Sequence, residues 1–346
     1  MTPLEAVSGV GPRIAKVLRS QGITTADLLA EQDTYELLNS TRLTEGTCRK
    51  LIRNARGMIN RYTMRTGGEV EEETAKRPVL TTGIGWLNRC LLGGIESGSI
   101  VEFFGPARSG KTQLCHQLAV TAQLPIEHGG LGGKVLWLDT SSSFRSMLIR
   151  ANAQRFGIDP NAALDSVSVQ QVIDIDHIQE LFHTVPSKCA EEDYRVVVID
   201  SLGGLFMLDY LRLAQVGPGR YEFAKLAKMV RSLVRATGAI VVYTNQVVEK
   251  IGIYGDNPNA PMGGHIVSHF PDYRFYIRRK MNDVRVIQLM DHASLPESQG
   301  EAYLGWGGLY DYPESKRESE SAIVLSMFHD DMADGRPGLR SICEEA

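Results

Sequence analysis

One segment of eight residues limits what this chain can fold into more than any other part of it. The segment has the pattern G-x-x-x-x-G-K-T and consists of Gly105, Pro106, Ala107, Arg108, Ser109, Gly110, Lys111 and Thr112. An apolar stretch typical of a strand, residues 100–104, precedes it, and a helical pattern over residues 113–120 follows. Because a helix begins directly after the glycine-rich turn, backbone N–H groups there can face an anion. The sequence therefore predicts a phosphate-binding loop in an α/β protein.

The residue types in this loop suit a polyphosphate ligand. Glycines allow the backbone to turn its N–H groups inward. We expect Lys111 to reach the β- and γ-phosphates of a nucleotide and the Thr112 hydroxyl to bind Mg²⁺. A glycine- and serine-rich turn with an incidental Lys-Thr pair is the alternative, and the flanking strand and helix argue against it.

Two further strands end in polar residues that would complete the site. Residues 195–199 form an apolar run that ends at Asp200, and in P-loop proteins such an Asp holds Mg²⁺ through water. A second apolar run, residues 239–243, ends in Thr244, Asn245 and Gln246. A parallel sheet would place this triplet at its ligand-binding edge. These patterns together predict a site for ATP and Mg²⁺; an ordinary strand-end turn is the alternative for the triplet.

The rest of the sequence predicts two folded domains. Residues 1–66 show short helical patterns, and Gly9 and Gly11 enclose a turn before Pro12, the layout of a helix-hairpin-helix unit. Residues 67–78 read as an acidic linker. In residues 79–313 strands and helices alternate, which predicts a mainly parallel twisted sheet with helices on both faces and antiparallel additions near 273–279 and 284–290. Residues 314–346 are acidic, and we expect them to be partly disordered.

Charge is unevenly distributed along the chain. The net charge is −4, but residues 1–65 hold ten Lys and Arg against six Asp and Glu, and residues 314–346 hold four against eight. A basic first domain indicates contact with an anion. The backbone N–H groups at Gly9 and Gly11 are suited to DNA phosphates, which position a protein without reading sequence. A purely structural helical bundle with a solvated basic face is the alternative.

Composition narrows where the protein is expected to work. No apolar run is long enough to span a membrane, and the first residues lack the pattern of a secretory signal. The five cysteines are scattered without C-x-x-C spacing, which suggests neither a disulfide framework nor a zinc site. We therefore expect a cytoplasmic protein with no membrane partner.

Taken together, these segments resemble the RecA/RadA family of strand-exchange recombinases, and its archaeal RadA branch most. The similarity extends from Val7 to about Tyr312. Besides the phosphate-binding loop, it rests on residues 7–12, 81–87, 92–96, 123–125, 129–133, 138–140, 199–202, 244–247, 261–265 and 295–297. The resemblance implies a RecA-like P-loop ATPase core with ATP and Mg²⁺ as cofactors. It also implies a protein that self-associates on single- and double-stranded DNA, with ATP between neighbouring subunits.

The resemblance assigns roles to the residues at matching positions. Lys111, Asp200 and Gln246 match catalytic positions, and Gln246 would sense the γ-phosphate for the DNA-binding loop that follows it, residues 247–262. Gln113, Arg145 and Asp291 match further nucleotide-binding positions, and Asp291 would cap ATP across a subunit interface. Residues 207–220 match the other DNA-binding loop. The implied DNA-binding residues are Gly9, Gly11, Arg212, Arg220, Lys250, Tyr254, Gly263 and Gly264.

Several positions depart from the family pattern inside the expected sites. Ser141 stands where the family has the glutamate that polarises the attacking water, and a hydroxyl cannot act as a carboxylate base at neutral pH. Leu148 replaces an arginine that stacks on adenine, which removes a cation–π contribution. Three arginines of the first DNA loop are replaced, with Arg212 and Arg220 each one residue away from a lost one.

The segment expected to drive polymerisation also differs. Met64 and Gly67 stand at the two ends of the family's Phe-x-x-Ala motif, and Met fills a pocket more loosely than Phe. Two interpretations therefore stay open. One is a RadA-type, DNA-dependent ATPase that exchanges strands and is slow because of Ser141. The other is a divergent paralogue that binds ATP and DNA and modulates a related recombinase. A metabolite kinase would explain neither the N-terminal domain nor residues 244–246.

Overall fold

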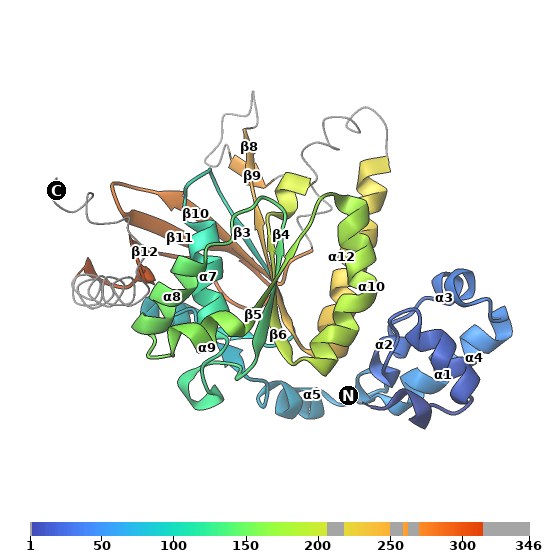
Figure 1. The fold of residues 1–346 in the computed structure, drawn as a ribbon. Helices are drawn as coiled ribbons and strands as arrows, with labels where there is room; N and C mark the ends of the chain where they lie inside the picture. The colour runs from blue at the N-terminus through green and yellow to red at the C-terminus, as the bar shows by residue number, and fades with distance from the viewer. Residues whose placement is uncertain (1, 206–217, 250–258, 262–269, 314–346) are drawn as a thin grey trace.

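The computed structural model describes residues 2–205, 218–249, 259–261 and 270–313. Its N-terminal part is a small bundle of short helices (Figure 1). The elements are η1 (Leu4–Ala6), α1 (Pro12–Arg19), α2 (Ala26–Ala30), α3 (Thr34–Thr41), α4 (Glu45–Met58) and η2 (Asn60–Tyr62). The expected all-α N-terminal domain is confirmed.

Local sequence sets where these helices begin. Thr25, Asp33 and Thr44 stand directly before α2, α3 and α4, and each side chain accepts a hydrogen bond from a backbone N–H of the first turn. Such caps contribute about 1 kcal/mol each. The apolar faces of the helices meet in a core whose fully buried members include Leu18, Leu29, Leu37 and Leu51.

The stretch expected to be an acidic linker contains a helix, α5 (Gly67–Thr74). The Thr66 side chain accepts a hydrogen bond from the Glu69 N–H, and the Glu69 carboxylate accepts one from the Thr66 N–H. This reciprocal capping box starts the helix in spite of Gly67 and Gly68. No residue of α5 is buried, so the connection between the two domains is helical but packs against neither.

The core domain is built on a sheet of nine strands. Their order is β13-β12-β11-β10-β3-β7-β6-β4-β5. From β10 to β5 neighbouring strands run parallel, whereas β10 to β13 pair antiparallel. The strands are β3 (Ile100–Phe104), β4 (Lys134–Asp139), β5 (Val167–Gln171), β6 (Tyr194–Asp200), β7 (Ile240–Asn245), β10 (Tyr273–Arg279), β11 (Val284–His292), β12 (Ser298–Gly305) and β13 (Gly308–Tyr310). The expected α/β class and its antiparallel additions are confirmed.

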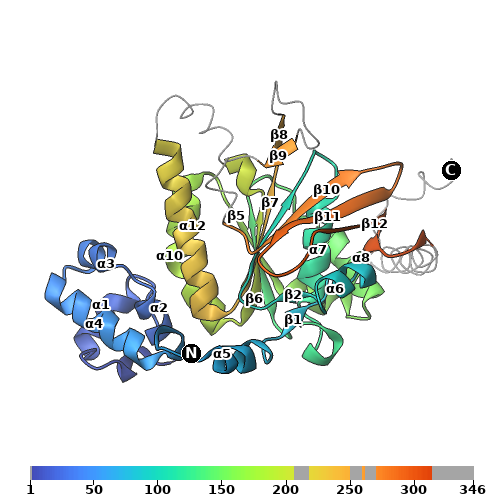
Figure 2. The ribbon, with the colours of Figure 1, turned by 180° about the vertical axis from the view of Figure 1, so that it is seen from behind.

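Helices cover both faces of this sheet, as Figures 1 and 2 show. One face carries α7 (Lys111–Thr121), α8 (Ser146–Arg155) and α9 (Pro160–Asp165); the other carries α10 (Ile175–Glu191) and α12 (Pro218–Thr237). An apolar core lies on each face of the sheet. Because side chains alternate along a strand, Val135 and Trp137 of β4 enter the core on the α7 face, while Leu136 and Leu138 enter the core on the α10 face. The remaining elements are β1 (Val79–Leu80), α6 (Gly85–Cys90), β2 (Ile95–Glu96), η3 (Ile126–His128), β8 (Val247–Glu249) and β9 (Asn259–Pro261).

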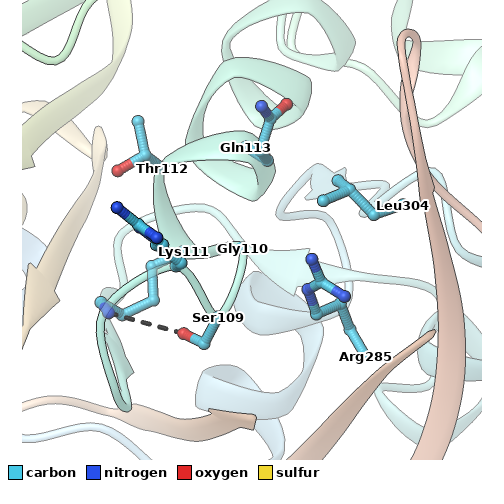
Figure 3. Close-up of a pocket in the computed structure, with 8 residues that line it drawn as sticks. Ser109, Gly110, Lys111, Thr112, Gln113, Arg285 and Leu304 are labelled. Carbon is cyan, nitrogen blue, oxygen red and sulfur yellow. Dashed lines mark hydrogen bonds between the residues drawn. The ribbon is translucent and has the colours of Figure 1, made fainter. Parts of the chain in front are cut away.

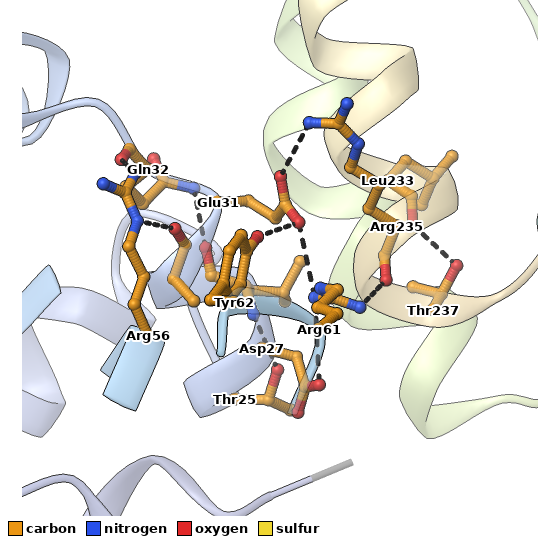
Figure 4. A network of polar contacts seen from close by, with 12 residues as sticks. Thr25, Asp27, Glu31, Gln32, Arg56, Arg61, Tyr62, Leu233, Arg235 and Thr237 are labelled. Carbon is orange, nitrogen blue, oxygen red and sulfur yellow. Dashed lines mark hydrogen bonds and ion pairs between the residues drawn. The ribbon is translucent and has the colours of Figure 1, made fainter. Parts of the chain in front are cut away.

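Charged side chains join the N-terminal domain to α12 (Figure 4). Glu31 is almost fully buried and lies between two arginines: its Oε1 is 3.3 Å from Arg61 Nη2, and its Oε2 is 3.9 Å from Arg235 Nη1 of α12. Arg61 also donates to the backbone carbonyl of Arg235, and Tyr62 donates to Glu31. Ala236 of α12 is buried in the core of the N-terminal domain. The two domains therefore share both apolar and ionic contacts.

A second contact joins the N-terminal domain to α10. Ser187 donates a hydrogen bond to the carbonyl of Gly22. Gly22 has φ +73°, and a Cβ atom there would lie only 1.7 Å from the carbonyl oxygen of His183. Glycine is therefore required at this position for the domains to meet as they do. Within the described residues, no helix combines the length and apolarity needed to cross a bilayer.

Candidate functional site

The phosphate-binding loop connects the end of β3 to the start of α7. Gly105 has φ +152°, and a Cβ atom there would lie 2.0 Å from the carbonyl oxygen of Ile277 on β10. Gly110, with φ +106°, stands directly before the first residue of α7. Both positions accept only glycine without a shift of the backbone. The loop backbone is thus fixed by its neighbours, and the N-terminus of an eleven-residue helix faces the space beyond it.

A pocket of about 290 Å³ opens at this helix N-terminus (Figure 3). Its walls come from the loop, from the start of α7 and from two distant strands. The lining residues are Arg108, Ser109, Gly110, Lys111, Thr112, Gln113, Arg285 and Leu304. Gly105, Pro106 and Ala107 precede the lining part of the loop. The predicted residues from Arg108 to Gln113 are thus brought together around one cavity.

Lys111 reaches back along the loop. Its Nζ donates to the carbonyl oxygens of Gly105 at 2.9 Å and Pro106 at 2.8 Å. Burial lowers the pKa of Lys111, while the charge of Asp200 acts in the opposite direction. The ammonium group is therefore held by neutral carbonyls at the edge of the pocket, where an anionic ligand would be a stronger partner.

Asp200, at the end of β6, is the point where three hydroxyl groups converge. Thr112 of α7 donates to its Oδ2 at 2.8 Å and Ser143 donates to the same oxygen at 2.6 Å, while Thr244 of β7 donates to Oδ1. The carboxylate is 2% exposed. A hydroxyl and a carboxylate beside a phosphate-binding loop are hard oxygen donors, so this pair fits Mg²⁺ held jointly with a phosphate.

The segment after β4 carries serines beside a second buried aspartate. Asp139 accepts hydrogen bonds from the backbone N–H groups of Ser141 at 3.2 Å, Ser143 at 3.0 Å and Phe144 at 3.2 Å. Ser141 is exposed, and its hydroxyl donates to the backbone carbonyl of Asp200 at 3.3 Å. Both strand-end carboxylates, Asp139 and Asp200, thus accept hydrogen bonds from several donors and are held in fixed positions.

His116 links the phosphate-binding helix to this serine segment. It is fully buried, its Nδ1 lies 2.8 Å from the Thr112 carbonyl oxygen, and its Nε2 accepts from the Arg145 N–H at 3.0 Å. These partners assign the neutral tautomer with the proton on Nδ1. Burial lowers the pKa of His116. The helix that begins with Lys111 is therefore fixed to the segment that follows β4.

The other residues expected at the nucleotide lie at varied places. Gln113 lines the pocket, and its Oε1 is buried without a hydrogen-bond partner. Arg145 is exposed and donates to the carbonyl oxygens of Ser142 and Phe144. Asp291 is exposed, six residues along β11 from the pocket residue Arg285, which is about 20 Å in a strand. Neither Arg145 nor Asp291 lines the cavity.

Gln246 follows β7 directly, and its side chain is half-buried. Its N–H donates to Asn245 Oδ1 at 2.8 Å. The two strands β8 and β9 pair antiparallel close after it, so the expected DNA-binding loop 247–262 begins and nearly ends in strand. Arg212, Lys250, Tyr254, Gly263 and Gly264 lie outside the described residues, and Arg220 is described only as part of the α12 backbone.

Sequence reasoning missed Arg285, which lines the pocket beside Gly110 (Figure 3), where a Cβ atom on Gly110 would lie 3.7 Å from Arg285 Cγ. Its side chain is 6% exposed, its Nη1 donates to the carbonyl oxygens of Asn282 at 3.0 Å and Val284 at 3.2 Å, and its Nε is buried without a hydrogen-bond partner. Arg285 is brought here because β11 lies two strands from β3. No local pattern marks it, since an isolated Arg in an amphipathic strand is common.

The N-terminal domain presents its hairpin at the surface. Gly9 has φ +95° and Gly11 is the N-cap of α1, and both are exposed. Five of the basic residues in this domain have partners within the protein: Arg56 donates to the carbonyl oxygen of Ala30 at 2.9 Å, and ion pairs join Arg19 to Glu5, Arg49 to Glu45, Arg61 to Glu31 and Arg65 to Glu73. Its basic excess is therefore less available to an anion than the count of charges suggested.

Two family comparisons and one relative bear on these features. The chain matches the Rad51 family over residues 75–312 and the SAM-like helix-hairpin-helix tandem over residues 1–56. It is similar to the DNA repair protein RAD51 of Saccharomyces cerevisiae, with 32% identity over 296 residues, which covers 85% of this chain and 74% of the relative. The first match spans the nine-stranded sheet and its phosphate-binding loop, and the second spans the exposed hairpin.

Proposed function

Because this chain belongs to the Rad51 family, we propose that it is an ATP-dependent DNA-binding protein of homologous recombination and DNA repair. In this proposal the protein pairs strands on single-stranded DNA in the manner of RadA. It binds ATP tightly and hydrolyses the bound ATP slowly. One observation carries the proposal: an intact phosphate-binding loop faces a segment in which Ser141 occupies the position of the expected base.

ATP binding rests on the loop and on its neighbours. Lys111 would exchange two backbone carbonyls for the β- and γ-phosphates, and the N–H groups at the start of α7 would face the phosphate chain. Arg285 would add a second cation from β11, and Gln113 would satisfy its buried Oε1 through a donor on the nucleotide. Charge-assisted hydrogen bonds of this kind are about twice as strong as neutral ones.

Thr112 and Asp200 would hold Mg²⁺, Thr112 directly and Asp200 through water. When bound, the ion neutralises charge on the phosphates and orients them. The residues around it hold the Asp200 carboxylate in one position, because Ser143 and Thr244 donate hydrogen bonds to its two oxygens. Lys111 then holds the terminal phosphate in place, and Gln246 would contact it from the end of β7.

Hydrolysis needs a group that takes a proton from the attacking water. The Ser141 hydroxyl is exposed and donates to a backbone carbonyl, and it cannot accept a proton at neutral pH. Losing a general base typically slows a reaction by about two to four orders of magnitude. We therefore infer a DNA-dependent ATPase whose turnover is slow, so that the ATP-bound state is long-lived.

DNA contact is proposed at two places. The exposed turn at Gly9 and Gly11 offers backbone N–H groups to duplex phosphates. Residues 207–220 and 247–262 would contact single-stranded DNA, and both segments leave the same edge of the sheet, after β6 and β7. Self-association would use the segment around Met64, which is fully exposed between η2 and α5. A Met there would anchor a neighbour weakly.

A second candidate function follows from Ser141 and Met64 together. A family member that holds ATP, turns it over slowly and self-associates weakly suits a paralogue that modulates a related recombinase. Strand exchange separates the two candidates: the protein alone promotes pairing in the first, and only alters pairing by a partner recombinase in the second. Electron micrographs with ATP and single-stranded DNA would show filaments in the first case and short or mixed assemblies in the second.

A phosphate-release assay tests the proposal directly. We expect tight binding of Mg-ATP, with slow release of phosphate that single-stranded DNA stimulates. Lys111→Ala is the matched control for background activity. It removes the ammonium group that would bind the phosphates and leaves the proposed DNA-binding segments, 207–220 and 247–262, unchanged. Fast turnover that Lys111→Ala abolishes would contradict slow hydrolysis. DNA affinity that is unchanged by ATP would contradict an ATP-dependent DNA-binding function.

A further inference from the structure

A single acidic residue interrupts the apolar strand that leads into the phosphate-binding loop. Glu102 is the third residue of β3, three positions before Gly105, and its side chain is completely buried. Burial raises the pKa of Glu102, and Arg274 acts against this effect. A carboxylate in such a place is costly unless paired and hydrogen-bonded. Its partners therefore indicate what it is there to hold.

One partner is Asn245, the last residue of β7. Its Nδ2 donates to Glu102 Oε1 at 2.8 Å, and its Oδ1 accepts from the Gln246 N–H at 2.8 Å. The amide is thereby fixed in one orientation between the carboxylate and the backbone of Gln246. Gly203, in the helical residues 202–205 that follow Asp200 and Ser201, packs on the same amide, since a Cβ atom there would lie 2.3 Å from Asn245 Oδ1. This amide therefore contacts residues that shortly precede both segments proposed to bind DNA, Gly203 before 207–220 and Gln246 before 247–262.

A second partner is Arg274, the second residue of β10. Its Nε donates to Glu102 Oε2 at 2.6 Å, and the pair is almost fully buried. Arg274 lies directly opposite Glu102 in the register of the parallel strands β10 and β3. In the sheet, β3 lies between β10 and β7 (Figure 1). Glu102 of β3 therefore contacts both of these strands. Along the chain, β7 is followed by residues 247–272 and then by β10, so Glu102 contacts the strand before this connection and the strand after it.

We propose that Glu102 is a positioning residue that transmits the nucleotide state from the phosphate-binding loop to the segments that bind DNA. This inference rests on the proposed function. Glu102 anchors Asn245 and Arg274 to the strand that ends in the loop. When Gln246 moves to contact the terminal phosphate, its N–H moves against an amide that cannot follow, so the displacement passes to residues 247–249 and beyond. Without the anchor, Asn245 rotates with Gln246 and the movement is absorbed locally.

The test measures how much a nucleotide strengthens DNA binding. Fluorescence anisotropy with a labelled oligothymidine gives the dissociation constant for single-stranded DNA, with and without Mg²⁺ and the slowly hydrolysed analogue ATPγS. The ratio of the two constants reports transmission. We expect a ratio of at least about tenfold in the wild-type protein, which corresponds to about 1.4 kcal/mol of coupling. A ratio of one in the wild type would overturn the proposed function itself, before any variant is examined.

The variant is the double substitution Glu102→Leu with Arg274→Met, which removes both charges at once. Replacing a buried ion pair by apolar residues of similar size is often neutral for stability, whereas removing one partner is not. We expect ATPγS affinity within about twofold of wild type, an unchanged melting temperature and a ratio near one. Lys280→Met with Glu301→Leu is the matched control, because it removes an exposed ion pair of the same sheet away from Asn245.

A double variant that keeps the wild-type ratio would overturn the inference. If that variant does not fold, Glu102→Gln with Arg274→Gln decides the question, since it keeps the approximate shape of both side chains, leaves no unpaired buried charge and weakens the hydrogen bonds that fix Asn245 and Arg274. We expect at least a threefold fall in the ratio with ATPγS affinity retained. A purely structural role for Glu102 predicts instead a lower melting temperature with an unchanged ratio, and that result would also overturn the inference.

Discussion

The two sides of the nucleotide site differ in what they can do. On the side of β3 and α7, Gly105 and Gly110 shape a loop that only glycine permits, and Lys111 lies against its carbonyls. On the side of β4, the residues after Asp139 are serines, and Ser141 bonds to a backbone carbonyl. Under the proposed function, the first side would hold a phosphate chain, and the second would offer hydroxyls where hydrolysis needs a base. Binding and turnover would then be separate properties of one site.

Ser141→Glu should have the largest effect on the difference between the two sides, because it adds a carboxylate to the side that has only hydroxyls. The position is exposed, so the longer side chain has room, and a carboxylate there could take a proton from water. We expect ATP turnover with single-stranded DNA to rise by about two to four orders of magnitude, measured as phosphate release. Ser146→Glu, also exposed and five residues later, is the control for added charge. An unchanged rate would mean that turnover is limited outside Ser141.

Removing the ammonium group tests the side that binds phosphate. Lys111→Ala should weaken ATP affinity by roughly 10- to 100-fold, because a charge-assisted hydrogen bond contributes about 1.5–3 kcal/mol. Titration calorimetry with Mg-ATPγS measures this change. Lys134→Ala, at the exposed start of β4, is the matched control and should bind like wild type. Equal affinity in both variants would contradict the assignment of Lys111.

Arg285 extends the same side to a strand far along the sequence. We expect Arg285→Gln to weaken ATPγS binding by about tenfold, which corresponds to the lower end of the range for a charge-assisted bond. Arg279→Gln is a close control, because Arg279 is exposed on β10 and donates to the same carbonyl of Asn282 at 3.0 Å. If the two variants bind alike, Arg285 is only a wall of the pocket.

The smallest expected effect concerns the link between the two sides. Burial lowers the pKa of His116 below its ordinary value of 6.5, so near that pH the unfolded chain binds a proton that the folded chain does not. Stability from this group is present above pH 6.5 and is lost as the pH falls below it. Thermal unfolding from pH 7.5 to 5 should show this loss in wild type.

His292 has a pKa lowered in the same direction by burial, so wild type alone cannot assign the effect. His116→Gln keeps a polar side chain and removes the titrating ring. We expect it to be less stable than wild type at pH 7.5 and to lose less stability on acidification. An identical pH dependence in both proteins would exclude His116 as the source.

Much of the nucleotide site could be predicted from the sequence because its parts are local. The loop pattern is contiguous, and strand-end polar residues such as Asp200 converge once a parallel sheet is assumed. Arg285 could not be found in this way, since only the order of strands brings β11 near β3. Ser143 was also missed, although it donates to Asp200, because a run of serines gives no sign of which hydroxyl points inward.

The connection between the domains shows a signal that was present but overlooked. Two glycines and a run of acids suggested an acidic linker over residues 67–78. The pair Thr66 and Glu69 is a capping box, and it is enough to begin α5 at Gly67. Likewise, Arg61 was counted as a basic surface residue, but tertiary contact with Glu31 uses it within the protein. Charge counts do not reveal which charges are already paired.

The closeness of Gly22 to α10 determines how near the N-terminal domain can lie to the core domain. The carbonyl oxygen of His183 occupies the place that a Cβ atom on Gly22 would take. The junction between the domains therefore accepts only a residue without a side chain at this position. One added methyl group would push the N-terminal domain away from α10 and would also weaken the contact of Ala236 with the N-terminal core. We therefore expect Gly22→Ala to change the arrangement of the two domains. Solution scattering should show a larger radius of gyration for this variant than for wild type.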